Sequence, residues 1–213
     1  MKKQIIGLIL TLSISISLAA PAFAAEPVEF NNNQAVSFVQ NIDGQDVEYL
    51  VYENEGVNYV QYTVNGRTRI ASYDTISGNL CLDGQVLAVV SPTSSDPLNS
   101  IISQIGITPY ADEEEEWHLY DIQYGDITSD ILTVVDWTSL LIGLVSGSIF
   151  VAPTIRDVVE EIAMTIVEEN LPTVYYTRYY YYKTPIVSYR PETRSSWEFY
   201  SDPGRTNLIG TIG

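Results

Sequence analysis

Few side chains in this sequence have the types and spacing that catalysis requires. The one histidine, His118, precedes Asp121 by three residues, and a carboxylate this near could orient an imidazole base. No nucleophile accompanies the pair, because the one cysteine, Cys81, lies between two leucines, where a reactive thiolate is disfavoured. We therefore expect an inert, buried thiol at Cys81, and the pair His118 and Asp121 does not by itself predict an enzyme.

Other patterns that carry chemistry are absent from the sequence. One cysteine excludes an internal disulfide framework and multi-cysteine zinc sites, and one histidine excludes the His-Glu-x-x-His motif. No Gly-x-Ser-x-Gly elbow, phosphate loop, dinucleotide fingerprint or EF-hand occurs. The glutamate pairs at 160–161 and 168–169 fall on the polar side of an expected helix and do not predict a glycosidase dyad. The sequence thus predicts a protein that is not an enzyme and uses no metal ion or other cofactor. A hydrolase that depends on His118 is the least favoured of the hypotheses that stay open.

Acidic residues dominate the charge of the chain. The 213 residues include 27 Asp and Glu against 10 Lys and Arg, which gives a net charge of −17. With 46% hydrophobic residues the chain can bury a core, but it lacks the basic surface of a nucleic-acid-binding protein. We expect no nucleic-acid partner. The basic residues are concentrated in residues 171–213, whereas the preceding part is strongly acidic.

The first 24 residues have the pattern of a secretory signal peptide. Lys2 and Lys3 precede an apolar segment, and Ala22 and Ala24 are the small residues of a cleavage site. We expect cleavage after Ala24 and a secreted, extracellular chain of residues 25–213. Loss of the two lysines leaves 8 basic residues against 27 acidic ones, so the net charge changes from −17 to −19. An uncleaved anchor is the alternative, but the apolar segment is short for a membrane span.

Residues 25–90 have the pattern of an antiparallel β-meander. Short β-prone segments alternate with dipeptides that suit tight hairpin turns. These dipeptides are Asp43-Gly44, Glu55-Gly56, Asn65-Gly66, Ser77-Gly78 and Asp83-Gly84. They predict about five strands, with one face of the sheet on a core and the other partly exposed. Residues 91–116, which are rich in proline, serine and acidic side chains, are predicted to form a linker to a second domain at residues 117–213.

A stretch without charged residues, 137–155, predicts an apolar helix that Pro153 ends or kinks. An acidic amphipathic helix is expected directly after it, because apolar residues from 155 to 167 recur at helical spacing. Three interpretations of the apolar helix remain open. It could be a buried core helix, a helix that leaves the core to enter a target membrane, or a permanent anchor.

Small residues form one stripe of the apolar helix. Ser139, Gly143 and Gly147 recur every four residues, so another helix could approach them closely. Ile149 and Phe150 lie in the same uncharged stretch. These five residues are the candidates for helix packing or membrane contact.

The segment from Thr173 to Lys183 is so rich in tyrosine that it is predicted to form a β-strand. Alternation sends Tyr175 and Tyr179 to one face of this strand and Tyr176 and Tyr180 to the other. Two interpretations are open: ring packing between strands, and a recognition surface for a glycan, a teichoic acid or a protein receptor. The candidate recognition surface comprises Tyr176, Arg178, Tyr180, Tyr182, Arg190 and Trp197.

These elements together predict an α+β protein. Its expected parts are an N-terminal antiparallel β-meander, a linker, an apolar helix beside an amphipathic one, and a C-terminal tyrosine-rich antiparallel sheet.

The order of these segments resembles a known family. With the segment from Tyr73 to Leu80 (YDTISGNL) and the C-terminal segments FYSD and RTNLIGT, the chain is similar to the large, unmodified geobacillin-like proteins, which are secreted and bacteriocin-like. The resemblance implies a secreted antibacterial protein whose action requires no catalytic residues. We expect such a protein to act through its apolar helix on the envelope or membrane of target Gram-positive bacteria. Such a role also implies an immunity protein in the producing cell. The alternative is an extracellular or surface-associated recognition module that uses the tyrosine- and arginine-rich sheet.

Overall fold

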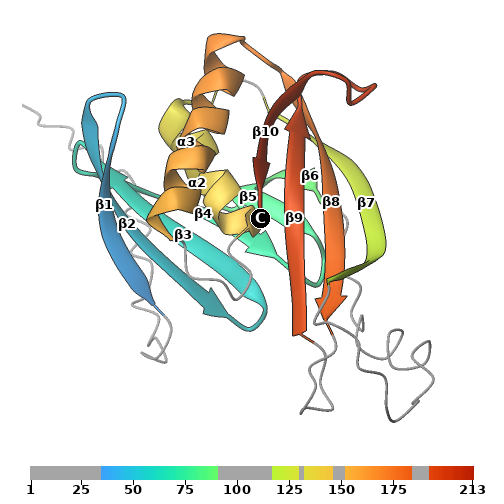
Figure 1. Ribbon diagram of the computed structural model, residues 1–213. Coiled ribbons are helices and arrows are strands. Elements are labelled where there is room, and N and C mark those ends of the chain that lie inside the picture. Colours follow the sequence, from blue (N-terminus) through green and yellow to red (C-terminus); the bar gives the residue numbers. More distant parts are fainter. Residues whose placement is uncertain (1–34, 91–116, 130–131, 146–151, 184–191) are drawn as a thin grey trace, which may run out of the picture. The chain divides into compact units, whose positions relative to one another are not determined.

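The computed structural model describes residues 35–90, 117–129, 132–145, 152–183 and 192–213. In these ranges the chain has the predicted α+β fold, with two antiparallel sheets and two helices (Figure 1). The described residues all belong to one compact unit. The predicted signal peptide with Ala22 and Ala24, and the predicted linker, lie outside the described residues.

The first sheet, sheet A, is a six-stranded antiparallel meander in the order β1-β2-β3-β4-β5-β6. Its strands are β1 (Val36–Ile42), β2 (Gln45–Asn54), β3 (Val57–Val64), β4 (Arg67–Asp74), β5 (Asn79–Leu82) and β6 (Gln85–Val89). Two-residue turns join most of these strands, and both residues of each turn have positive φ, as at Asn65 (51°) and Gly66 (73°). This geometry matches the twist of the flanking strands, which is why the turn dipeptides predict the meander. The sequence predicted about five strands, but the sheet has six, because a further strand, β6, follows the turn at Asp83 and Gly84.

The second sheet, sheet B, has four strands in the order β10-β9-β8-β7. They are β7 (His118–Thr128), β8 (Thr173–Lys183), β9 (Glu192–Tyr200) and β10 (Leu208–Ile212). The tyrosine-rich strand β8 lies inside this sheet, between β7 and β9 (Figure 1).

Two helices contribute to the core. They are α2 (Val134–Val145) and α3 (Pro153–Glu168), and they pack against each other. Helix α2 therefore begins three residues before the expected start at 137. Pro153 occupies the first turn of α3, where its missing N–H costs no helical hydrogen bond, so it starts this helix rather than ending the preceding one.

Both sheets and both helices share one hydrophobic core. Helix α2 packs on sheet A, where the Asn58 side-chain amide of β3 donates a buried hydrogen bond of 3.1 Å to the Gly143 carbonyl. Helix α3 packs on sheet B, where a Cβ atom on Gly210 of β10 would lie 2.6 Å from Ile162 Cγ1. The predicted segments 25–90 and 117–213 thus meet through α2, which has ten buried residues.

Candidate binding surface

Sheet B has an inner face in the core, which the strand register identifies. Residues directly opposite each other in an antiparallel sheet lie on the same face. Tyr176 pairs with Phe199 and Gly125, and both aromatic residues are buried. A Cβ atom on Gly125 would lie 2.1 Å from the Tyr176 hydroxyl oxygen, so the tyrosine side chain occupies the space above this glycine. The face that carries Tyr176 is therefore the inner one.

The structure brings most of the predicted recognition residues together, but inside the protein. The guanidinium carbon of Arg178 lies 4.4 Å from the ring centroids of both Tyr180 and Trp197. Trp197 is 1% exposed, and Tyr176 and Tyr180 are buried as well. The structure corrects the exposure expected for these three residues, because their face supplies the apolar area that packs beneath α3. Arg178 and Tyr182 are half-buried, and Arg190 lies outside the described residues.

The small-residue stripe of α2 contacts a sheet. Ser139 is buried, and its hydroxyl donates to the Val135 carbonyl of its own helix at 2.7 Å. A Cβ atom on Gly143 would lie 3.5 Å from Val60 Cγ2 of β3. The small residues therefore let strand β3 approach α2 closely. The sequence had predicted that a second helix would occupy this position. Gly147, Ile149 and Phe150 lie outside the described residues.

The Asp121 carboxylate does not orient the His118 imidazole as a general base, as the sequence had suggested. Its ring packs on Tyr182, with 5.3 Å between the centroids. The Asp121 carboxylate instead accepts hydrogen bonds from the Ile122 backbone N–H at 2.9 Å and the Gln123 amide at 3.3 Å. In the described part of the chain, no group of three His, Cys, Asp or Glu residues could hold a metal ion. The geometry at His118 thus offers no oriented general base.

The outer face of sheet B carries partly exposed aromatic and aliphatic side chains. Tyr124 is 57% exposed, Leu119 48% and Ile122 37%. Half-buried tyrosines of β8 and β9 continue the same face. We call this surface the outer tyrosine face; it comprises Leu119, Ile122, Tyr124, Tyr175, Tyr179, Tyr181, Glu198 and Tyr200. Sequence reasoning missed the three β7 residues, although the alternation of Ile122 and Tyr124 with Gln123 and Gly125 was a signal for a one-sided strand.

A carboxylate fixes two rings of the outer tyrosine face. The hydroxyls of Tyr179 and Tyr200 both donate to Glu198 Oε2, at 2.7 Å and 2.5 Å. These hydrogen bonds to a carboxylate raise the pKa of both tyrosines above the ordinary value, because ionising either hydroxyl would remove a donor and add a second negative charge. Both hydroxyls therefore stay protonated at neutral pH, and both rings are held in place without a ligand.

Two arginines stack on rings of the same surface. The Arg205 guanidinium carbon lies 5.0 Å from the Tyr124 ring centroid, and its nitrogens donate to the carbonyls of Tyr176 and Gly125 at 3.3 Å. The Arg194 guanidinium carbon lies 4.5 Å from the Trp117 ring and 5.2 Å from the Tyr181 ring. Such contacts hold the arginine side chains along the aromatic surface.

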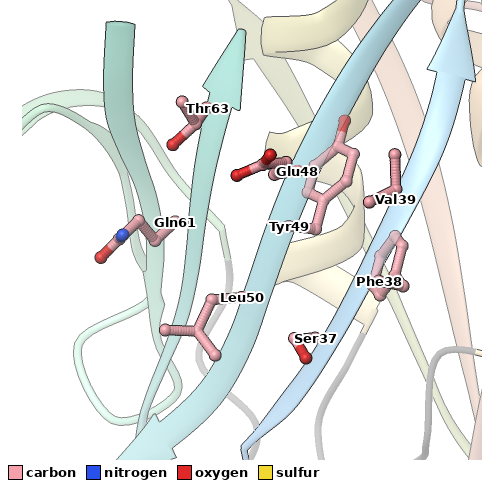
Figure 2. Close-up of a pocket in the computed structure, with 8 residues that line it drawn as sticks. All are labelled: Ser37, Phe38, Val39, Glu48, Tyr49, Leu50, Gln61 and Thr63. Atoms are coloured by element: carbon pink, nitrogen blue, oxygen red, sulfur yellow. The ribbon is translucent and has the colours of Figure 1, made fainter. Parts of the chain in front are cut away.

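Sheet A carries an open groove on the opposite side from α2. The groove has a volume of about 550 Å³. Its outward-facing lining is mixed, with Glu48 and Leu50 of β2 beside Gln61 and Thr63 of β3, as Figure 2 shows. Tyr49 and Phe38 also border the groove but stack on each other, with 4.9 Å between their centroids. Among the residues that line the groove, Glu48 is the one carboxylate, and no histidine, lysine or cysteine lies beside the hydroxyls of Ser37 and Thr63.

Cys81 is expected to react slowly with thiol reagents. It is half-buried on β5, opposite Ser72 of β4, and desolvation raises the pKa of its thiol. A raised pKa lowers the thiolate fraction near neutral pH, and the thiolate is the form that reacts. We expect alkylation by iodoacetamide near pH 8 to be slower in the folded protein than in denaturant, and to accelerate as the pH rises. Equal rates in the two states would contradict the assignment of an inert thiol.

The described residues contain no helix with both the length and the apolar character needed to cross a bilayer. Comparisons of the chain with protein-family models, with curated proteins and with solved structures found no match. The assignment of function therefore depends on the geometry of the surfaces described above.

Proposed function

We propose that this protein is a secreted, non-enzymatic recognition protein that binds a polysaccharide of the bacterial cell envelope through the outer tyrosine face. The observation that carries the proposal is the exposure of Tyr124, Leu119 and Ile122 on a sheet whose other face is packed in the core. Contiguous exposed apolar surface of this kind marks interaction sites on soluble proteins. Sugar rings present flat C–H faces that stack on aromatic rings, whereas their hydroxyls pair with polar groups around those rings.

The preformed geometry of the surface supports this proposal. The hydroxyls of Tyr179 and Tyr200 are already held by Glu198, and the Arg205 guanidinium is already held by three backbone carbonyls. Side chains held in one conformation lose little entropy when a ligand binds, so rigid aromatic surfaces bind more tightly than mobile ones.

Tyr124→Ala is expected to weaken binding to Gram-positive cell walls about tenfold, because a tyrosine that anchors a ligand typically contributes more than 1 kcal/mol to binding. Co-sedimentation of the purified protein with insoluble cell walls over a range of protein concentrations measures this change. Val39→Ala is the matched control, because Val39 is 61% exposed on sheet A. Its affinity should equal that of the wild type.

Two outcomes of this experiment would contradict the proposal. Absence of wall binding by the wild-type protein would refute the proposed function itself. Loss of binding in Val39→Ala with full binding in Tyr124→Ala would move the site to the groove of sheet A, which Val39 lines.

Antibacterial action through the apolar helix remains the alternative proposal. It requires α2 to leave the core and to break the hydrogen bonds that Tyr62 and Arg69 donate to Asp136. The preformed outer tyrosine face needs no such rearrangement, and this favours recognition. Growth inhibition of Gram-positive indicator strains that survives Tyr124→Ala would favour the helix instead, and with it the implied immunity protein.

A further inference from the structure

The chemistry of the outer tyrosine face narrows the class of polymer that it can bind. Glu198 lies on β9 between Thr177 of β8 and Thr211 of β10, in the cross-strand row that also holds Tyr124 of β7. A polymer that stacks on Tyr179 and Tyr200 therefore places polar groups near the carboxylate that both hydroxyls contact.

One oxygen of Glu198 is used by neither tyrosine. Tyr179 and Tyr200 both donate to Oε2, which leaves Oε1 as an acceptor for a donor from outside. A carboxylate oxygen accepts strong, charge-assisted hydrogen bonds from hydroxyl groups. It repels phosphate groups, which carry negative charge and no hydrogen to donate when they bridge two sugars or polyols.

Arg194 and Arg205 do not reverse the preference of this face for hydroxyl groups over phosphate groups. Arg205 donates to three backbone carbonyls, and the guanidinium groups of Arg205 and Arg194 both lie along tyrosine rings. The exposed Asp126 belongs to the next cross-strand row, opposite Tyr175, and adds a second carboxylate to the same face. Residues 171–213 hold five basic residues against three acidic ones, but the net charge of the whole chain is −17, and at long range this total disfavours attraction of a polyanion.

We infer that the ligand is a neutral polysaccharide, and that Glu198 determines this specificity by accepting sugar hydroxyls at Oε1 and excluding phosphate-bearing polymers such as teichoic acids. This inference rests on the proposed function, because it concerns the ligand of the same surface. It adds the chemical class of the polymer and the residue that selects it.

Cell walls before and after removal of their phosphate-bearing polymers test the inference. Hydrofluoric acid strips these polymers and leaves the glycan network. We expect the wild-type protein to sediment with stripped walls at least as well as with intact walls. A soluble neutral oligosaccharide should compete for this binding, whereas a soluble glycerol phosphate polymer should not.

Glu198→Gln supplies the residue-specific arm of the test. The variant keeps the size of the side chain but replaces charge-assisted hydrogen bonds by neutral ones, so affinity for stripped walls should fall about tenfold. Affinity for intact walls should fall less, because the repulsion of phosphate is also removed. Glu161→Gln is the control on the exposed surface of α3 and should bind like the wild type. Unfolding midpoints of both variants show whether the fold is retained.

The outcomes separate the two proposals. Binding to intact but not to stripped walls would overturn the neutral ligand and leave envelope recognition standing. Unchanged affinity of folded Glu198→Gln for both kinds of wall would overturn the role of Glu198. Failure of the wild-type protein to bind either wall would refute the proposed function itself. If Glu198→Gln does not fold, competition by the two soluble polymers still decides between a neutral and an anionic ligand.

Discussion

Asp136→Ala is expected to lower the free energy of unfolding by about 3–5 kcal/mol, because it removes one partner from a buried cluster of charged and polar groups. Asp136 is 4% exposed at the start of α2. Its Oδ1 accepts hydrogen bonds from the Tyr62 hydroxyl at 2.5 Å and from Arg69 Nη1 at 2.6 Å. The alanine variant would leave the buried tyrosine hydroxyl without this acceptor and would separate α2 from sheet A at its N-terminal end.

The same carboxylate also caps α2. Asp136 Oδ2 accepts a hydrogen bond from the Thr133 backbone N–H at 3.1 Å, and the Thr133 hydroxyl accepts one from the Asp136 N–H at 3.2 Å. This reciprocal arrangement satisfies two backbone donors that the first turn of a helix leaves without partners. Loss of the cap therefore adds to the cost of losing the contacts with sheet A.

Denaturant-induced unfolding of Asp136→Ala and Asp83→Asn measures this effect. Asp83 also pairs with Arg69, at 2.8 Å, but its side chain is 47% exposed. Asparagine tolerates the positive φ of this turn residue, so Asp83→Asn should cost less than about 1 kcal/mol. Equal destabilisation by the two variants would show that burial of Asp136 contributes nothing to holding α2 on sheet A.

The cluster around Asp136 also explains why the sequence misplaced the start of α2. In the sequence, Asp136 directly precedes the uncharged stretch, so the helix was expected to begin at 137. The carboxylate is tolerated inside a buried helix because Arg69, which is 67 residues earlier in the chain, neutralises it. A pairing over such a separation leaves no local trace in the sequence, whereas the spacing of Thr133 and Asp136 does fit a capping box.

Local features predicted the meander of sheet A well. A dipeptide such as Asn65-Gly66 determines its own turn conformation, and the turn sets the register of the two strands beside it. No distant contact is needed for this part of the fold. The helix pair was predicted for a similar reason, since the uncharged stretch and the apolar periodicity that follows it are local properties of the chain.

The faces of sheet B could not be assigned in the same way. Alternation separates Tyr176 from Tyr175 and Tyr179, but both faces of β8 are aromatic, so composition does not say which face is buried. The choice depends on two glycines, because Gly125 accommodates Tyr176 and Gly210 accommodates Ile162 of α3. Both contacts join segments that are distant in the sequence, and the candidate recognition surface was consequently assigned to the inner face.

Trp197→Ala tests this assignment of faces most directly and should cost about 3–5 kcal/mol of unfolding free energy, as for other fully buried aromatic residues. The Trp197 ring lies 5.5 Å from that of Tyr176 and 6.2 Å from that of Phe199, between centroids, and Arg178 stacks on it at 4.4 Å. Removing the indole leaves a cavity that these neighbours can fill only in part. Thermal and denaturant unfolding measure the change.

Tyr124→Ala is the control from the opposite face of the same sheet. Because Tyr124 is 57% exposed, its truncation should change the unfolding free energy by no more than about 0.5 kcal/mol. The two variants should then lose wall binding for different reasons. Loss in Trp197→Ala should follow the fraction of unfolded protein as denaturant or temperature is varied, because the total stability of a domain is only about 5–15 kcal/mol. Loss in Tyr124→Ala should occur in fully folded protein. A Trp197→Ala variant that keeps the wild-type midpoint and still loses binding would place the recognition surface on the inner face, where the sequence alone had assigned it.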